Sequence, residues 1–164
     1  MTQSTPAPSK SMTDGDHAES DVDRLAQAFF RAVSFEAGGR PSYDDIYDLF
    51  IESGLLIKNS GQEPEVSSIS AFITPRQQLV DSGELTEFSE VEVSHRDESF
   101  GNIAHRLSIY TKRGVSGGVA FQGHGVISTQ LIHTPTGWRM TSMAWDDERA
   151  GLSMPDDAQD RPAP

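Results

Sequence analysis

The hydrophobic pattern of this 164-residue chain changes its period near Glu84, and that change constrains the fold more than any other feature. Before Glu84, apolar residues recur every three or four positions, the period of an α-helix that buries one face. After Glu84 they alternate with polar residues, the period of a half-buried β-strand. Helices followed by consecutive strands favour an α+β domain in which helices cover one face of a mostly antiparallel sheet.

Three helices are predicted before the change of period. The first spans residues 22–37, and the second spans residues 42–52 with Ser42 in a capping-box pattern at its start. The third spans residues 68–82 and is kinked or restarted at Pro75, because proline cannot donate a helical hydrogen bond. All three helices therefore precede the long strands.

The strands are predicted mainly in the second half, after a short strand at 55–57 and a polar loop at 59–67. Gly123 and Gly125 lie within one of the long strands, and glycine inside a strand often marks a bend or a bulge. Four long strands are predicted at residues 91–96, 103–110, 121–133 and 138–147. Because short turns join most of them, we expect a strongly bent sheet.

The two ends of the chain differ from its middle in composition. Residues 1–20 and 151–164 hold few large apolar side chains, so we predict disordered tails on a single domain at 21–150. No apolar run approaches the roughly 20 residues that span a bilayer, and the first residues lack the apolar core of a secretory signal. We therefore expect a cytoplasmic location.

Charge and cysteine content exclude several classes of function. The chain carries 13 Lys+Arg against 25 Asp+Glu, a net charge of −12, which repels phosphate backbones and anionic lipids. We expect neither nucleic acid nor membrane as a partner. The absence of cysteine excludes disulfides, zinc–thiolate sites and thiol nucleophiles. The histidines show no metal-ligand spacing, so no metal site is predicted.

Three strand motifs resemble a known family. They are FGNIAHRLSIY at 100–110, GVISTQL at 125–131 and WRMTSMAWDDER at 138–149. They are similar to a bacterial SnoaL-like subgroup of the nuclear transport factor 2-like superfamily, whose pattern is an FG-x-x-AH strand, a strand with Ser and Gln two apart, and a last strand ending W-D-x-E. The resemblance covers roughly residues 22–155.

The resemblance implies a cone-shaped, cystatin-like sheet that wraps around a pocket and is closed by the first helices. Superfamily members commonly pair as homodimers through the outer face of the sheet. Some are isomerases, dehydratases or cyclases that act on apolar rings without a cofactor, and others bind only ligands or proteins. No cofactor is therefore expected, and the fold does not decide the function.

Two residues are candidates for a general base. His105 alternates with apolar residues on its strand, and an imidazole exchanges protons near neutral pH. The alternative is a hydrogen-bonded histidine in the core or an interface. Asp146 follows Trp145, whose indole would raise the pKa of a neighbouring carboxyl. The alternative is an ion pair with Arg149.

Further residues are candidates for binding a ligand. Ser128 and Gln130 share a strand face and would donate to a ligand carbonyl, or else pair across the sheet or a dimer interface. Tyr43 offers a phenol at the pocket mouth, or buries its ring and leaves its hydroxyl in water. Aromatic residues would line the pocket or simply form the core, namely Phe29, Phe50 and Trp145.

Three hypotheses follow for the function. The first is binding of a small apolar or aromatic molecule, which needs a mostly apolar cavity of about 300 Å³ or more. The second is a cofactor-free isomerase, dehydratase or cyclase with His105 or Asp146 as general base, and it fails for His105 if that side chain faces away from the cavity. The third is a homodimeric protein-interaction module.

Arg106 lies on the same strand as His105, and we expect its charged side chain to face solvent or a partner.

Overall fold

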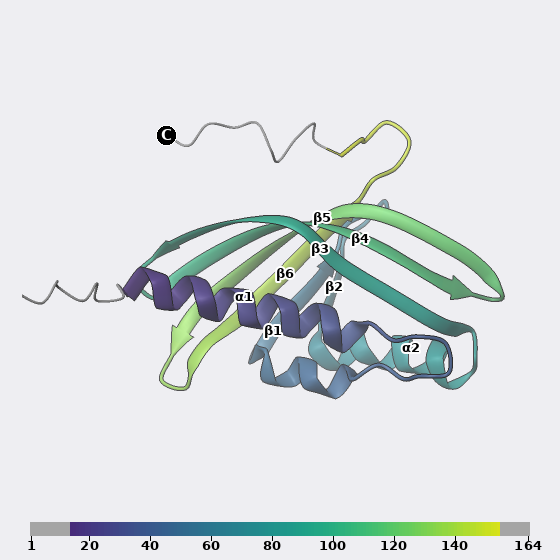
Figure 1. Cartoon of the computed structure of the whole chain (residues 1–164), viewed down its shortest axis with the longest axis horizontal. Helices are drawn as coiled ribbons and strands as arrows, with labels where there is room; N and C mark the ends of the chain where they lie inside the picture. Colours follow the sequence, from purple (N-terminus) through teal and green to yellow (C-terminus); the bar gives the residue numbers. More distant parts are fainter. Residues whose placement is uncertain (1–13, 155–164) are drawn as a thin grey trace, which may run out of the picture.

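The computed structural model describes residues 14–154, with side chains from Asp21 onward. It confirms an α+β domain (Figure 1). Its elements, in chain order, are α1 (Asp14–Val33), the 3-10 helix η1 (Tyr43–Asp48), β1 (Phe50–Lys58), β2 (Glu65–Ser68), α2 (Ile69–Asp81), β3 (Leu85–Phe100), β4 (Ile103–Ser116), β5 (Val119–Thr134) and β6 (Gly137–Asp147).

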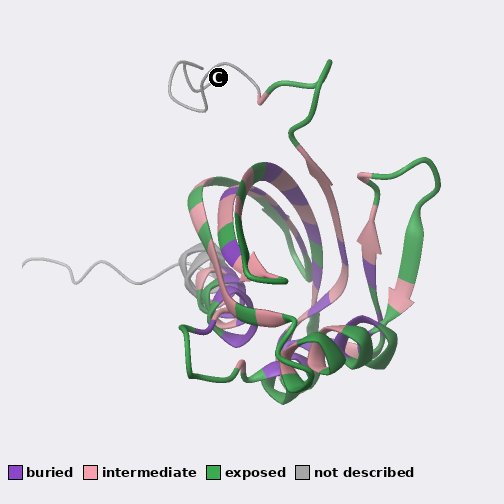
Figure 2. Cartoon of the chain, turned by 90° about the vertical axis from the view of Figure 1, so that its right-hand side faces the viewer, coloured by how far each residue is buried: buried purple, intermediate pink, exposed green. Residues whose placement is uncertain are grey.

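The six strands form one curved sheet in the order β2-β1-β6-β5-β4-β3. All neighbours are antiparallel except β1 and β6, which are parallel. The sheet arches over α1, η1 and α2, which lie on its concave side (Figures 1 and 2). The predicted bent sheet with helices on one face is thus confirmed.

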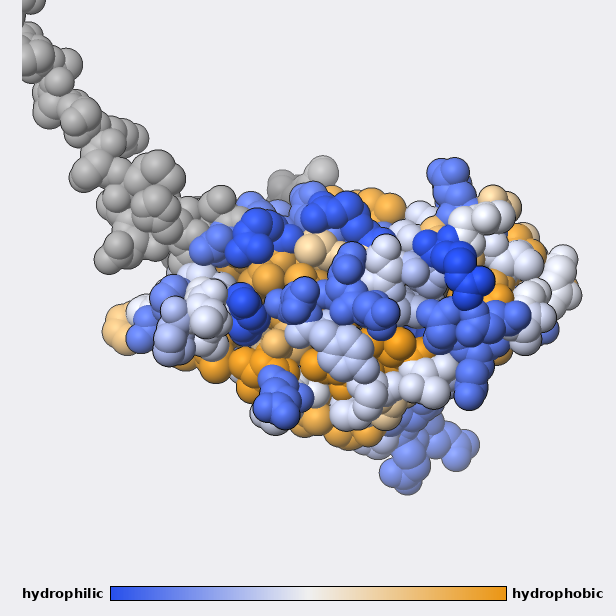
Figure 3. All heavy atoms as spheres, turned by 90° about the horizontal axis from the view of Figure 1, so that it is seen from below, coloured by the Kyte–Doolittle hydropathy of each residue, from blue (hydrophilic) through white to orange (hydrophobic). Residues whose placement is uncertain are grey.

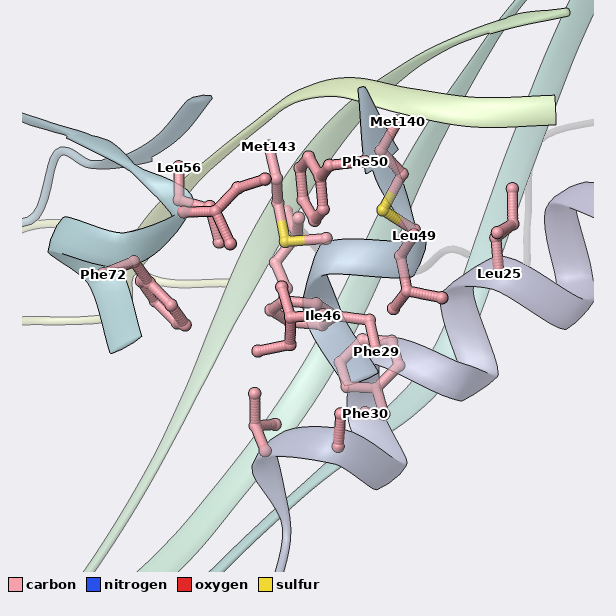
Figure 4. Packing of buried hydrophobic residues seen from close by; sticks show 14 of the residues in the cluster. Leu25, Phe29, Phe30, Ile46, Leu49, Phe50, Leu56, Phe72, Met140 and Met143 are labelled. Carbon is pink, nitrogen blue, oxygen red and sulfur yellow. The ribbon is translucent and has the colours of Figure 1, made fainter. Parts of the chain in front are cut away.

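The hydrophobic core lies between the helices and the concave face of the sheet. Helix α1 buries Leu25, Phe29 and Val33, which recur at helical spacing, and turns its polar residues outward. The close-up view shows α1, η1 and α2 directing apolar side chains toward β1 and β6 (Figure 4). Seen from the helix side, hydrophilic side chains cover most of the surface, with hydrophobic ones visible between them (Figure 3).

The chain leaves α1 along the open edge of β3. The Ser34 hydroxyl accepts a hydrogen bond from the Glu90 N–H at 3.0 Å. Phe35 and Phe88 then exchange two backbone hydrogen bonds, of 2.7 and 3.0 Å. The end of α1 is therefore joined to the middle of β3 through backbone groups that an edge strand would otherwise leave unpaired.

The second predicted helix is shorter than expected. It ends at Asp48 as η1, and Phe50 already belongs to β1 opposite Met140 of β6. The Met140 N–H donates to the Leu49 carbonyl at 2.9 Å, so pairing with the sheet replaces the last helical turn. The predicted cap is also absent, because the Ser42 side chain makes no capping hydrogen bond.

The third predicted helix is confirmed as α2, with Pro75 inside it and no restart. Its cap is Ser68, whose hydroxyl accepts a hydrogen bond from the Ala71 N–H at 3.2 Å. Just before it, the predicted polar loop contains strand β2, which pairs with β1. This segment forms a strand because its backbone pairs with β1, although its own sequence is too short and polar to predict one.

Both predicted tails include residues that the structure shows as ordered. Leu152 exchanges two backbone hydrogen bonds with Arg149, of 3.0 and 2.9 Å. Residues 14–20, expected to be disordered, form the start of α1. Residues 1–13 and 155–164 lie outside the described part of the chain. Among residues 14–154, no helix combines the length and the apolar character needed to cross a membrane.

Gly123 and Gly125 do not produce a bulge. Strands β4 and β5 keep one unbroken register from Ile103 opposite Ile132 to Ser116 opposite Val119. The register shifts occur elsewhere, and β3 has two of them, between Leu85 and Glu87 and between Glu92 and Ser94. Of the bend or bulge expected at the two glycines, the bulge is absent, and both residues have a steric role that is described below.

Arg106 is buried, contrary to the expectation that its charge faces solvent or a partner. Its side chain is 1% exposed, because three carboxylates from two other elements surround the guanidinium. Nε and Nη2 donate to Asp97 at 2.7 and 3.0 Å, and Nη2 also donates to Asp23 of α1. Glu92 lies 3.8 Å from Nη1. This network ties α1, β3 and β4 together.

The second register shift in β3, between Glu92 and Ser94, brings these acids to one side of the sheet. An extra residue in a strand reverses the face on which later side chains lie. Glu92 precedes the shift, Asp97 follows it, and both reach Arg106. His95 lies between them, with Nδ1 at 3.2 Å from Glu92. The irregularity in β3 therefore makes this network possible.

We expect Arg106→Leu to lower the free energy of unfolding by about 3–5 kcal/mol, since it leaves buried carboxylates without their counter-charge. Urea denaturation measures the change. The matched control is Arg96→Leu on β3, where the arginine is 60% exposed and lies 3.5 Å from Glu98; there we expect a change within about 0.5 kcal/mol. Equal effects of the two substitutions would contradict a structural role for the buried network.

Candidate functional site

A cavity of about 210 Å³ lies between the concave face of the sheet and the helices. Residues from α1, η1, α2 and five strands reach it, so it forms only when the whole domain is folded. Most of its wall is apolar, formed by Phe29, Val33, Phe72, Leu85, Phe88, Phe121, Ile127, Met143 and Trp145.

Six polar side chains complete the wall of the cavity. They come from five different elements and include three cations, one carboxyl group and two phenols. They are Tyr43 of η1, Lys58 of β1, Arg76 of α2, Glu90 of β3, and Tyr110 and Lys112 of β4.

Glu90 is the only carboxyl group in the described lining of the cavity. Phe88 and Glu90 lie between the two register shifts of β3 and therefore share the concave face, where Glu90 lies opposite Lys112. Burial raises the pKa of Glu90 to about 7, with Asp147 adding to the rise and Lys112 and Arg76 opposing it. A carboxyl group with such a pKa exchanges protons near neutral pH.

Tyr110 and Lys112 are held by one carboxylate. The Tyr110 hydroxyl donates to Asp147 of β6, and Lys112 Nζ donates to the same oxygen at 2.7 Å. Burial and the bond to Asp147 raise the pKa of Tyr110 well above its ordinary value. Burial alone would raise the pKa of Asp147, but the donors Lys112 and Tyr110 lower it, so this carboxylate stays ionised.

Gly125 makes room for the Tyr110 phenol. It lies directly opposite Tyr110 on β5, and a Cβ atom there would collide with the phenol and lie 2.6 Å from the Asp146 carbonyl oxygen. Gly123 similarly faces Lys112, although a Cβ atom there would meet only the flexible side chain, at 3.2 Å. These two glycines leave space on β5 for the polar groups of β4.

The Arg76 guanidinium lies over the Phe72 ring, with 3.6 Å between the guanidinium carbon and the ring centroid. Its Nη1 donates to the Phe72 carbonyl at 2.8 Å. Burial lowers the pKa of Arg76, although Tyr43 and Glu90 oppose this. Among residues 21–154, no carboxylate lies within 4.0 Å of the Arg76 guanidinium.

Three of the residues predicted to bind a ligand do line the cavity, namely Phe29, Tyr43 and Trp145. Burial raises the pKa of the Tyr43 phenol, and the charge of Arg76 partly offsets the rise. Phe50 does not line it. Its ring packs against Phe29 in the core, with centroids 6.5 Å apart, because this residue starts β1 instead of continuing the helix.

The other predicted site residues lie on the convex face of the sheet, away from the cavity. His105 bonds Ser128 through Nε2 and Oγ at 2.9 Å, and Gln130 lies opposite His105 on β5. Asp146 forms the ion pair with Arg149 that was the alternative expectation. The structure therefore does not bring either predicted base to the cavity.

The reason is that alternation shows which residues share a face but not which face is concave. His105 shares its face with Leu107 and Ile109, an apolar set that is typical of a core. The concave face instead carries Arg106 and Tyr110, which the carboxylates of other elements satisfy.

Glu90, Arg76 and Lys112 were missed by sequence reasoning. Glu90 lies in a run of alternating acids and valines that is typical of a solvated strand, and Arg76 follows Pro75 on an amphipathic helix. Their role depends on packing between elements far apart in the sequence. No local sequence motif therefore indicates that Glu90 lies in the cavity.

A second group of potential ligand atoms lies at Arg106. Single atoms of Asp23, His95 and Asp97 lie within 4.8 Å of one another. Arg106 already donates to both carboxylates and neutralises part of their charge. We interpret this group as part of the ion network that holds α1 to the sheet.

No protein-family model matches the sequence, and no curated protein matches it either. Solved structures, in contrast, share its fold. A nuclear transport factor 2-like superfamily protein from Salmonella enterica serovar Typhimurium superposes with a TM-score of 0.67 at 12% identity, covering 90% of this chain and 99% of that protein.

Two further similar structures come from Novosphingobium aromaticivorans. One is provisionally named an aromatic ring hydroxylase (TM-score 0.67, 18% identity, covering 81% of this chain and 90% of that protein). The other is a nuclear transport factor 2-like protein with a cystatin-like fold (TM-score 0.62, 14% identity, 83% and 86% covered). At these identities the likeness shows the fold alone, which is the nuclear transport factor 2-like fold.

Glu90 should make stability depend on pH in a direction opposite to that of most acids. Its pKa is raised from 4.5 to about 7 on folding, so the folded state binds more protons between these values. The free energy of unfolding therefore falls as pH rises through this window. At about 1.4 kcal/mol per pKa unit, the full cost of ionised Glu90 is about 3 kcal/mol.

Urea denaturation of the wild type and Glu90→Gln, from about pH 4.5 to about pH 8, isolates this contribution. We expect the variant to become the more stable protein above pH 7. Glu98→Gln, an exposed position on the same strand, is the control and should show no such crossover. Parallel curves for the wild type and Glu90→Gln would contradict the burial of the carboxyl group.

Proposed function

We propose that this chain binds one small, mostly apolar molecule in the cavity between the sheet and the helices. The observation that carries the proposal is the lining itself, in which nine apolar side chains surround a few converging polar groups. Ligand sites in proteins commonly have this composition, with polar groups that fix the orientation of an otherwise apolar ligand.

The size of the cavity limits the ligand. Its volume of about 210 Å³ does not meet the requirement of about 300 Å³ or more that the sequence analysis set for this hypothesis, so the proposal is restricted to a smaller ligand. An apolar protein cavity of about 150 Å³ accommodates benzene. A molecule with a single aromatic ring and one small polar substituent therefore fits best, and the aromatic walls formed by Phe72 and Trp145, whose ring centroids are 6.0 Å apart, favour it further.

The SnoaL-like assignment of the strand motifs supports a ligand-binding or enzymatic role, and it stays a prediction. A homodimer formed through the convex face and a cytoplasmic location also stay predictions. The exposed side chains Val91, Phe100 and Ile103 lie on or beside that face, which is consistent with a partner there.

Intrinsic fluorescence offers a direct test, because Trp145 lines the cavity and Trp138 does not. The chain holds two tryptophans, so the Trp138→Phe variant leaves Trp145 as the only reporter. We expect one-ring compounds such as toluene, benzyl alcohol and benzamide to change its emission in a saturable way.

Val33→Phe in the same background should abolish this response, since the larger side chain fills the cavity from α1. Val119→Phe is the control, because Val119 is 69% exposed at the start of β5. Circular dichroism verifies that both variants fold. An unchanged response in Val33→Phe would place the binding outside this cavity.

A second function, proton transfer by Glu90, is favoured by the pKa of about 7 for this buried carboxyl group. An ionised Glu90 can remove a proton from a carbon next to a ligand carbonyl, and the proton then resides on its carboxyl group. The Lys112 ammonium and the Tyr43 phenol line the same cavity and can donate to the enolate oxygen that forms. This is the first half of an isomerisation or a dehydration.

Exchange of hydrogen for deuterium tests this function. With 1-indanone in heavy water, we expect the protein to accelerate exchange at the carbon beside the carbonyl. Glu90→Gln should lower the accelerated rate by about a hundredfold or more, while His105→Gln on the convex face should not change it. Exchange that depends on His105 and not on Glu90 would reject the assignment of the base.

A further inference from the structure

We infer that the ligand of this cavity is a small aromatic carboxylic acid, bound as its anion to Arg76, and that Glu90 takes up a proton when the anion binds. The inference rests on the proposed function, since it names the chemical class of the molecule held by the same cavity. It is argued from the charges of the lining, the partners of each cation, and the position of the lone carboxyl group.

The charge of the cavity is opposite to that of the protein. The whole chain has a net charge of −12, yet the cavity is lined by three cations and a single carboxyl group. Burying a charge without a partner is costly, so a cavity of this kind favours a ligand of the opposite charge. An anion is therefore favoured over a cation or a neutral molecule.

The partners of the cations identify the one that is available. Lys112 is held by Asp147 at 2.7 Å, and Lys58 lies 3.7 Å from Glu65. Arg76 has no carboxylate within 4.0 Å among residues 21–154. A guanidinium carries five donors arranged to match a carboxylate, and here one of them is used by the Phe72 carbonyl.

The surroundings of Arg76 indicate the rest of the ligand. The guanidinium lies 3.6 Å from the centre of the Phe72 ring, and Phe72 meets Trp145 edge to face. A carboxylate bound to Arg76 would therefore have an aromatic wall beside it. An aromatic ring attached to that carboxylate fills the apolar part of a cavity of about 210 Å³.

Glu90 couples this binding to pH. With Glu90 ionised, a bound anion would add a second negative charge to the cavity, whereas a protonated Glu90 leaves the positive charge of Arg76 for the ligand. The charged and titratable groups that face Glu90 across the cavity are Lys58, Arg76, Lys112, Tyr43, Tyr110 and, behind Lys112, Asp147. Since the pKa of Glu90 is about 7, affinity for the anion should fall as pH rises through neutrality.

Calorimetric titration of the full chain with benzoate and with benzamide tests the inference. The two probes have the same shape, and only benzoate is charged. At about pH 6 we expect benzoate to bind about tenfold more tightly than benzamide. Above about pH 7 the affinity for benzoate should fall, approaching tenfold per pH unit for one proton taken up, while that for benzamide stays constant.

Variants assign the effects to residues. Arg76→Gln should weaken benzoate binding by about tenfold or more and leave benzamide binding unchanged. Glu90→Gln should remove the pH dependence and bind benzoate more tightly than the wild type at about pH 8. Arg113→Gln is the matched control, because this exposed arginine of β4 does not line the cavity.

The outcomes separate the two proposals. If benzamide binds as tightly as benzoate at every pH, the anion inference is overturned and the proposed binding function stands. If neither probe nor any of the neutral one-ring compounds binds, both are overturned. Should Arg76→Gln fail to fold by circular dichroism, the comparison of benzoate with benzamide in the wild type still decides, since it requires no variant.

Discussion

The register shift of β3 between Glu92 and Ser94 is the constraint on which much of this structure depends. Before it, Glu90 faces the cavity; after it, Asp97 faces Arg106, although regular alternation would place the two acids on opposite faces. One extra residue therefore allows one strand to supply both the cavity carboxyl group and the acids of the ion network. The network in turn holds α1 against the sheet, and α1 forms one wall of the cavity.

The polar groups of the molecule are divided between two buried sites with opposite electrostatics. At Arg106, carboxylates outnumber the single guanidinium and each accepts a hydrogen bond within the protein, although Nη1 of Arg106 has no hydrogen-bond partner among the described residues. In the cavity, cations outnumber the single carboxyl group, and Arg76 lacks an acidic partner among the described residues. Charges that are paired within the protein are typical of structural stabilisation, whereas a cation without an acidic partner is typical of a binding site.

Sequence reasoning predicted the fold better than the site. The change of period at Glu84, the long strands and the helix with Pro75 were predictable because they depend on local pattern. Which face of the sheet is concave was not predictable from the sequence. His105, Leu107 and Ile109 share a face that is as apolar as that of a core strand, whereas a charged residue such as Arg106 is expected to be exposed. Partners 83 residues apart in sequence, such as Asp23 and Arg106, leave no local signal. Glu90 depends on the same kind of long-range packing.

The contact between Phe35 and Phe88 also affects how the domain behaves among copies of itself. Strand β3 ends the sheet, and the bare edge of a sheet is a template on which foreign strands add and aggregates grow. The backbone of Phe35 occupies part of that edge beside Glu90. Farther along, Arg96 and Glu98 place charges where another strand would have to approach. The segment that follows α1 therefore also limits the addition of foreign strands at this edge.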